Sequence, residues 1–176
     1  MLVHLDGARL GNAAARLGVP LRDLAECADS VNFSLSKGLG CPVGSLWVGG
    51  RKARERAHVW RKRLGGGMRQ AGVLAAAGLY ALEHQLPRLV EDHEKARRLS
   101  CALQGAPGLE VDEDRVQTNI LLLQTRRRAD EVIARAAGEG VLLTAFGQHT
   151  VRCVTHLDVS LAQMDEAAAA ISRAAG

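Results

Sequence analysis

The sequence predicts an α/β protein in two parts, and three observations support this fold class. Strand patterns at residues 2–6 and 31–36 flank a helical segment, which is the order of a parallel β-α-β unit. A second series of strand and helix patterns follows Pro87. The 176 residues are 47% hydrophobic and 24% charged, as in globular proteins, and suffice for one ordinary domain or somewhat more. We expect the two parts to span residues 1–86 and 87–176.

Three strands are predicted in the first part. Residues 2–6 (LVHLD) form a short strand that ends in a carboxylate, and residues 31–36 alternate apolar and polar side chains. Leucines and alanines at helical spacing occupy the interval, interrupted by Gly18-Val19-Pro20. A third strand near residues 43–48 follows too closely for a parallel crossover, so it should run antiparallel.

Two helices of opposite character complete the first part. Residues 51–63 are rich in Lys and Arg and predict a basic amphipathic helix. Residues 68–84 are apolar on most faces and predict a helix that is buried within the chain or against another subunit. Nucleic-acid binding is one interpretation of the basic helix. A solvated helix in which Glu55 pairs with neighbouring arginines explains the same charges better.

The second part predicts a smaller α/β lobe with a mainly antiparallel sheet. Helices are expected at about 88–104, 129–138 and 160–174, and strands near 108–112, 117–124, 140–145 and 150–155. No internal repeat and no low-complexity linker interrupts the chain.

Composition narrows the possible functions. A formal charge of +4 and a pI near 9.2 do not by themselves indicate nucleic acid, and only 3% of residues are aromatic, which argues against base stacking. The four widely spaced cysteines lack metal-ligand spacing and predict reduced core thiols. No apolar run approaches the roughly 20 residues of a membrane span. We therefore expect a cytoplasmic protein with no metal, no nucleic-acid partner and no membrane association.

Asp6 and Lys37 are the first candidates for chemistry. Each lies at the carboxyl end of a predicted parallel strand, so both side chains could reach one crevice above the sheet. A lysine beside small residues can form a Schiff base, and a carboxylate can hold the proton on the ring nitrogen of pyridoxal phosphate. Each residue also has a simpler interpretation: Lys37 as a solvated charge, and Asp6 as the N-cap of the following helix.

Five segments of the sequence carry a resemblance to a known family. They are His4-Leu5-Asp6-Gly7-Ala8-Arg9, residues 35–45 (LSKGLGCPVGS), residues 61–72 (RKRLGGGMRQAG), Asp92-His93 and residues 152–158 (RCVTHLD). In order and spacing, these segments resemble the threonine aldolases over essentially the whole chain.

The resemblance implies a fold, a cofactor and a reaction. The fold would be the C-terminal part of a fold-type I pyridoxal phosphate enzyme of the aspartate aminotransferase superfamily. It would comprise part of the three-layer α/β large domain, with its mostly parallel sheet, and the small lobe. The reaction would be cleavage of L-threonine or L-allo-threonine to glycine and acetaldehyde, in a homo-oligomer whose substrate is a β-hydroxy-α-amino acid.

The same resemblance implies roles for six residues. Lys37 matches the lysine that binds pyridoxal phosphate, and Asp6 matches the partner of its ring nitrogen. Arg9 and Arg152 match the arginines that hold the substrate carboxylate, Arg9 also lying at the cofactor, and a guanidinium suits a carboxylate because two parallel charge-assisted bonds can form. Two further basic residues, Lys62 and Arg69, resemble residues that line the active site or the subunit boundary.

The chain departs from the family pattern at its beginning. Threonine aldolases carry earlier strands, a phosphate-binding loop and a ring-stacking histidine ahead of the segment that matches residues 4–9. The resemblance therefore implies an N-terminally truncated aldolase, which we expect to be inactive alone. Two alternatives are a non-catalytic subunit that associates with a full-length aldolase and another fold-type I lyase.

Overall fold

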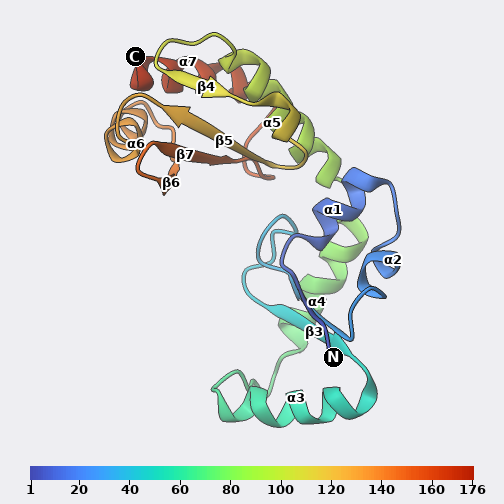
Figure 1. The fold of residues 1–176 in the computed structure, drawn as a ribbon. Coiled ribbons are helices and arrows are strands. Elements are labelled where there is room, and N and C mark those ends of the chain that lie inside the picture. Colours follow the sequence, from blue (N-terminus) through green and yellow to red (C-terminus); the bar gives the residue numbers. More distant parts are fainter. The chain divides into compact units, whose positions relative to one another are not determined.

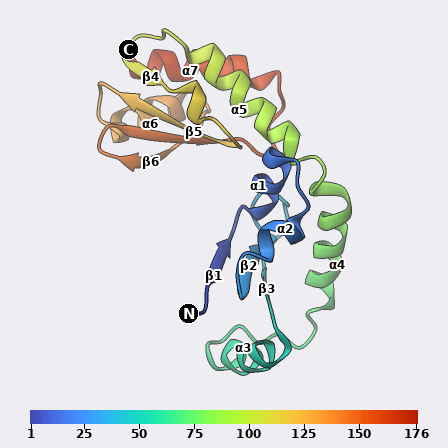
Figure 2. The same ribbon diagram turned by 45° about the vertical axis from the view of Figure 1, so that its right-hand side comes forward.

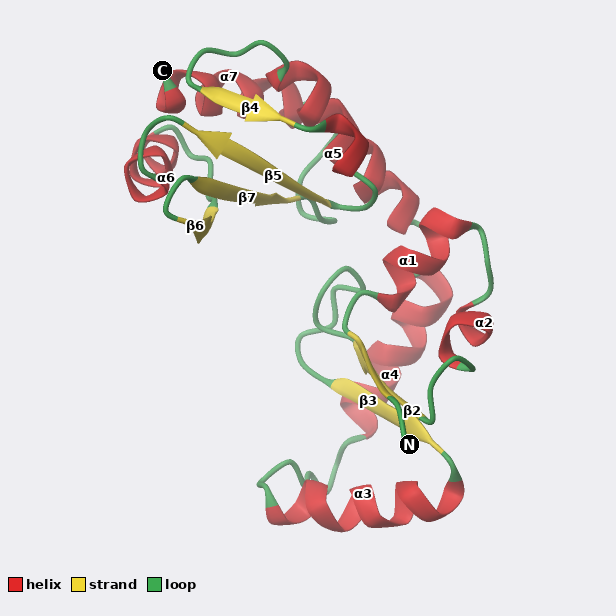
Figure 3. Cartoon of the chain, viewed as in Figure 1, coloured by secondary structure: helices red, strands yellow, loops and turns green.

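Two separate hydrophobic cores form in the chain, all of whose residues, 1–176, are described by this computed structural model. One core belongs to the unit Met1–Leu89 and the other to the unit Val90–Gly176 (Figure 1). Each unit combines a sheet with helices, so the predicted α/β fold class is confirmed (Figure 3).

The first unit contains a three-stranded sheet in the order β1-β2-β3. The strands are β1 (His4–Gly7), β2 (Ser30–Ser34) and β3 (Ser45–Gly49), and the helices α1 (Leu10–Leu17) and α2 (Leu21–Ala25) connect the first two. β1 and β2 are parallel, with Asp6 opposite Asn32, whereas β3 is antiparallel to β2. Both directions confirm the predictions, including the β-α-β unit. The predicted break after α1 is also present, because Gly18 ends this helix in a left-handed conformation with φ 67°.

Helix α3 (Arg51–Arg63) has the bounds expected from its charges and no buried residue. Figure 2 shows it beyond the amino-terminal end of β1. Its solvated character is therefore confirmed, although Glu55 makes no ion pair. Trp60 instead packs against the guanidinium of Arg63, whose Cζ lies 5.3 Å from the ring centroid.

The prediction of one helix over residues 68–84 is wrong in its bounds, and burial within the chain holds for one face only. α4 covers Gly72–Tyr80 and continues as the single π-helical turn η1 (Ala81–Gln85). Only one face reaches the core, through Gly78, where a Cβ would lie 3.2 Å from Cδ1 of Leu35, and through Ala81. Val73 and Leu79 are each 68% exposed, because the first unit has no further layer to cover the outer face of α4.

The second unit is built around a four-stranded sheet in the order β4-β5-β7-β6, with every pairing antiparallel as predicted. Its elements are α5 (Leu89–Leu103), β4 (Leu109–Val111), η2 (Glu113–Arg115), β5 (Ile120–Thr125), α6 (Ala129–Gly138), β6 (Thr144–Gly147), β7 (Thr150–Val154) and α7 (Gln163–Ala175). The strand expected at residues 140–145 begins later, because the chain leaves α6 through Gly140 at φ 83° before it can enter the sheet.

One face of this second sheet forms the core. Leu121 and Leu123 of β5 and Val151 and Cys153 of β7 are buried with apolar side chains of α5, α6 and α7. The alternate residues point to the opposite face. There, Leu122 is 40% exposed.

The four cysteines are free thiols, but only Cys41 and Cys153 are buried. The prediction of core thiols is therefore wrong for Cys27 and Cys101. Cys27 lies in the turn after α2, and Cys101 lies off the stripe of α5 that faces the core. No helix in the structure has both the length and the apolar character of a membrane span.

Candidate active site

Asp6 lies on β1, one residue before the strand ends. Its Oδ1 accepts a hydrogen bond from the backbone N–H of Ala8 at 3.1 Å. The N-cap of α1 is instead Arg9, which makes no side-chain cap bond. The N-cap interpretation of Asp6 is therefore wrong, and its carboxylate is exposed to solvent.

Gly7 allows β1 to approach β2 closely beside Asp6. A Cβ at Gly7 would lie 2.6 Å from the carbonyl oxygen of Asn32 and 2.9 Å from Cγ1 of Val31. Any side chain at this position would push the two parallel strands apart. The glycine thus keeps Asp6 on a strand that pairs tightly with the strand leading to Lys37.

Lys37 follows β2 in a hydrogen-bonded loop that returns to β3. The N–H of Leu35 donates to the carbonyl of Gly44 at 3.0 Å, and the N–H of Cys41 donates to the carbonyl of Leu35 at 3.0 Å. The Lys37 carbonyl accepts from the N–H of Gly40 at 2.9 Å. These bonds define the backbone at Lys37, while its ammonium group is exposed and forms no hydrogen bond or ion pair.

The pairing of β1 with β2 places Asp6 and Lys37 at one edge of the sheet. Parallel strands end at the same edge, which is where open α/β sheets bind ligands. Asp6 lies opposite Asn32 on β2, and Lys37 follows Asn32 along the chain. The carboxylate and the ammonium group form no ion pair with each other. This donor set fits a cofactor that carries a basic ring nitrogen and an aldehyde.

Helix α1 holds Arg9 at the same end of β1. Its carbonyl accepts the first helical hydrogen bond, from the N–H of Ala13 at 3.1 Å. The residue is half-buried, so its position depends on the packing of α1. Arg9 is therefore held near Asp6 by a helix rather than by a mobile loop.

Lys62 and Arg69 lie in a different part of the first unit. β3 is antiparallel to β2, with Gly49 opposite Ser30, so it ends beside the start of β2. α3, which carries Lys62, therefore begins at the edge opposite to that of Lys37, and Arg69 follows in the loop before α4. Both side chains are exposed. The structure does not gather them with Asp6 and Lys37.

Arg152 belongs to the second unit and lies on β7, on the face opposite to the helices. Its cross-strand neighbours are Leu122 on β5 and Thr144 on β6. The Arg152 Nε donates to Thr144 Oγ1 at 3.3 Å, and no acidic side chain pairs with the guanidinium. Arg152 is therefore a half-buried cation without an internal counterion.

The contact between Thr144 and Arg152 was not foreseen from the sequence. Side chains alternate between the two faces along each strand of a hairpin, and this alternation predicts which residues share a face. The register between β6 and β7 shifts between Ala145 and Gly147, however, so counting back from the turn does not give the pairing.

A buried polar network lies beyond the end of β7. The Lys95 ammonium group donates to Asp92 Oδ1 and to the carbonyl of His156, each at 2.9 Å. Thr155 Oγ1 donates to the carbonyl of Asp92 at 2.6 Å, and Asn119 Nδ2 donates to the carbonyl of Thr155 at 2.8 Å. The network ties the segment after β7 to α5 and to the residue before β5.

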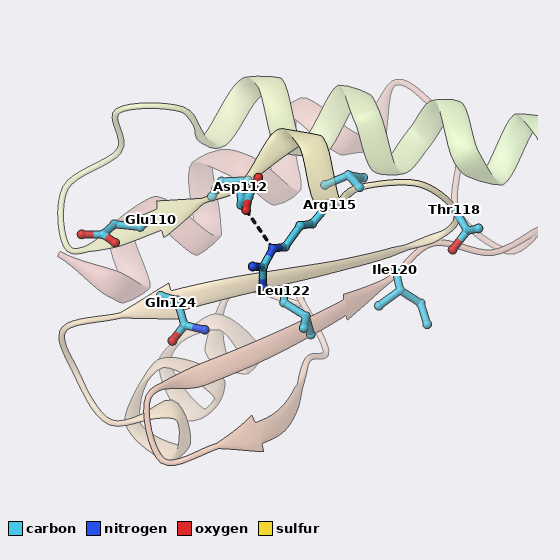
Figure 4. A pocket seen from close by; sticks show the side chains of 9 residues that line it. Glu110, Asp112, Arg115, Thr118, Ile120, Leu122 and Gln124 are labelled. Atoms are coloured by element: carbon cyan, nitrogen blue, oxygen red, sulfur yellow. Dashed lines mark ion pairs between the residues drawn. The ribbon is translucent and has the colours of Figure 1, made fainter. Parts of the chain in front are cut away.

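An open hollow lies beside β4 and β5 of the second unit. Asp112 and Arg115 form an ion pair of 3.0 Å at its wall, and Ile120, Leu122 and Gln124 line its floor (Figure 4). Arg152 does not line this hollow, although it neighbours Leu122. No group of three or more His, Cys, Asp or Glu side chains could hold a metal ion.

Solved structures show which class of protein has this fold. A structure of the threonine aldolase from Leishmania major matches 100% of this chain and 52% of its own, with a TM-score of 0.73 and 16% identity. At that identity the likeness shows the fold alone, which is that of the fold-type I enzymes.

The family follows from the sequence comparisons. The model of the beta-eliminating lyase family matches residues 1–126, so the chain belongs to this family. Low-specificity L-threonine aldolase 1 of Arabidopsis thaliana is 43% identical over 162 residues, which are 90% of this chain and 45% of the relative. The low specificity L-threonine aldolase of Escherichia coli (strain K12) is 46% identical over 174 residues, 96% of this chain and 50% of the relative. The chain thus spans about half the length of these relatives.

Proposed function

We propose that this chain carries the lysine, the aspartate and the arginines of a pyridoxal phosphate-dependent threonine aldolase. The reaction is cleavage of L-threonine or L-allo-threonine to glycine and acetaldehyde. One observation carries the proposal: Asp6 and Lys37 lie at the same edge of neighbouring parallel strands and are not paired with each other. The similarity to low-specificity L-threonine aldolases supports this choice of substrate.

Each side chain has a defined task in this proposal. Pyridoxal phosphate, when bound, supplies a ring that accepts the electron pair of the broken Cα–Cβ bond. The Asp6 carboxylate would hold the proton on the ring nitrogen, and the Lys37 amine would hold the cofactor through its aldehyde carbon, with the aldehyde oxygen released as water. Arg9 and Arg152 bind the substrate carboxylate, and this orientation selects which bond at Cα is aligned for cleavage.

The assignments of Lys62 and Arg69 fit a subunit boundary better than the edge that carries Lys37. Both are exposed at the opposite end of the sheet within this chain. Exposed apolar side chains on α4 and β3, such as Leu79 and Val48, support association into a homo-oligomer because such surfaces usually mark an interface. Sedimentation analysis with Leu79→Lys tests this assembly: the variant should shift toward the monomer, and an unchanged distribution would exclude α4 from the interface.

Covalent labelling tests the role of Lys37 directly. The chain is incubated with pyridoxal phosphate, reduced with borohydride and mapped by peptide mass spectrometry. We expect the adduct on Lys37, its loss in Lys37→Arg, and its retention in Lys52→Arg, which changes an exposed lysine of α3. Equal labelling of Lys37 and Lys52, or none on Lys37, would contradict the proposal.

Substrate tests distinguish the aldolase from the other fold-type I reactions. Any turnover by this chain should convert L-threonine and L-allo-threonine to glycine and acetaldehyde, whereas serine and an amino-acid and keto-acid pair should not react comparably. If the labelled chain has no turnover by itself, co-purification with a full-length aldolase tests whether it acts as an associated subunit.

A further inference from the structure

We propose that Thr144 is a positioning residue that orients the Arg152 guanidinium so that its two terminal nitrogens face the substrate carboxylate. This inference rests on the proposed function, in which Arg152 binds that carboxylate. It goes beyond that function by assigning to Thr144, on the neighbouring strand β6, the role of orienting the Arg152 side chain.

The register of the sheet places the two side chains together. Thr144 on β6 and Leu122 on β5 both lie directly opposite Arg152 on β7. Directly opposed residues of antiparallel strands project from the same face, with Cβ atoms about 5 Å apart. Leu122, Arg152 and Thr144 therefore form one row across the face that no core helix covers.

The Thr144 hydroxyl group bonds Arg152 at two points. Oγ1 accepts from Arg152 Nε at 3.3 Å and lies 3.3 Å from the Arg152 carbonyl oxygen, to which it donates. A hydroxyl has one proton to donate and two lone pairs, so both bonds can form together. Because a β-branched side chain has few rotamers, Thr144 holds its oxygen at a defined place.

This contact leaves a particular part of the guanidinium available. Arginine can bind a carboxylate sideways through Nε and one Nη, or end-on through both Nη atoms. The bond from Nε to Thr144 favours the end-on arrangement. No acidic side chain of the chain pairs with Arg152, so the terminal nitrogens have no competing internal anion.

Both cross-strand neighbours of Arg152, Leu122 and Thr144, are uncharged. Leu122 provides an apolar neighbour for the aliphatic part of the arginine. The row thus offers one fixed cation flanked by a hydroxyl group and a hydrocarbon side chain.

Arginine side-chain NMR and glycine titration of the full 176-residue chain with pyridoxal phosphate test the inference. The Arg152 Nε–H signal is assigned by its loss in Arg152→Lys. We expect Thr144→Val to speed solvent exchange of this proton and to weaken glycine binding by about 2- to 10-fold. Valine suits an edge strand, so folding should be preserved.

Two further variants separate orientation from general structure. Thr144→Ser keeps the hydroxyl group and should restore slow exchange and near-normal affinity. Thr150→Val removes a hydroxyl group that donates to Gln124 Oε1 at 3.1 Å on the same face, and it should behave like the wild type. Loss of affinity in Thr150→Val equal to that in Thr144→Val would overturn the inference.

The outcomes for Arg152 and Thr144 distinguish this inference from the proposed function. If Arg152→Lys weakens glycine binding but Thr144→Val changes neither exchange nor affinity, the positioning role fails and carboxylate binding by Arg152 stands. If Arg152→Lys leaves glycine binding unchanged, the assigned role of Arg152 fails and the inference fails with it.

Discussion

The ammonium group of Lys95 lies 2.9 Å from Oδ1 of Asp92 inside the second unit, where the two side chains are 7% and 0% exposed. Neither charge would be stable there alone, because burial removes the hydration of an ion. Lys95 also bonds the carbonyl of His156, just beyond β7. The pair therefore links α5 to the strand that carries Arg152.

Replacing Lys95 by Met should destabilise the second unit by about 3 kcal/mol, because the Asp92 carboxylate stays buried without its lysine. Arg115→Met is a matched control, since Arg115 and Asp112 form an exposed pair of the same spacing. It should cost less than about 1 kcal/mol. Amide hydrogen exchange in β5 and β7 measures the unfolding free energy of the second unit separately from that of the first. Equal losses in both variants would contradict the prediction.

Ser100→Ala should stabilise the second unit by about 1 kcal/mol. Ser100 is 1% exposed, and its Oγ has no hydrogen-bond partner. The hydroxyl group therefore loses its hydrogen bonds to water on folding and gains none in the protein. The control is Ser172→Ala, which removes a hydroxyl group that donates to the carbonyl of Ala168 at 2.8 Å. The same exchange measurement should show no gain for this control, and a loss of stability in Ser100→Ala would refute the expectation.

The pair of Arg98 and Asp165 should make stability depend on pH in the acid range. Two hydrogen bonds from the guanidinium, at 2.8 and 2.7 Å, lower the pKa of Asp165. A lowered native pKa means that the pair stabilises the fold above the unfolded pKa of about 3.9 and that this contribution is lost as pH falls through the native value. Arg98→Gln should raise the Asp165 midpoint in a carboxyl-carbon NMR titration, whereas Arg97→Gln should leave it in place.

Thiol labelling near pH 8 should separate the cysteines into two classes. Cys27 and Cys101 are exposed and should react in the native protein, whereas Cys41 and Cys153 should react only on unfolding. A hydrogen bond with Glu113 raises the pKa of Cys101 and lowers its thiolate fraction. Glu113→Gln should therefore accelerate labelling of Cys101, with Asp114→Asn as the unaffected control. Fast native labelling of Cys153 would contradict its burial.

Features that depend on residues close together in the sequence were predicted more accurately than features that depend on packing between distant segments. The charges of residues 51–63 defined α3 to the residue, because a basic helix between glycine-rich segments needs no distant partner. Whether α4 is covered by this chain or by another subunit was left open, because apolar side chains favour burial but do not show which chain covers them. The N-cap alternative for Asp6 was similarly decided by the path of the backbone, which placed Arg9 at the cap.

By itself, the sequence determined the parallel strands that carry Asp6 and lead to Lys37, because alternation and the length of the crossover are local properties of the chain. Only the tertiary structure decided that Thr144 meets Arg152. A register shift between β6 and β7 sets that contact, and registers depend on how whole strands pack against a shared core. The tertiary structure also decided that Lys95 and Asp92 are buried together. Their burial depends on the elements that pack around them, which the two residue types alone do not indicate.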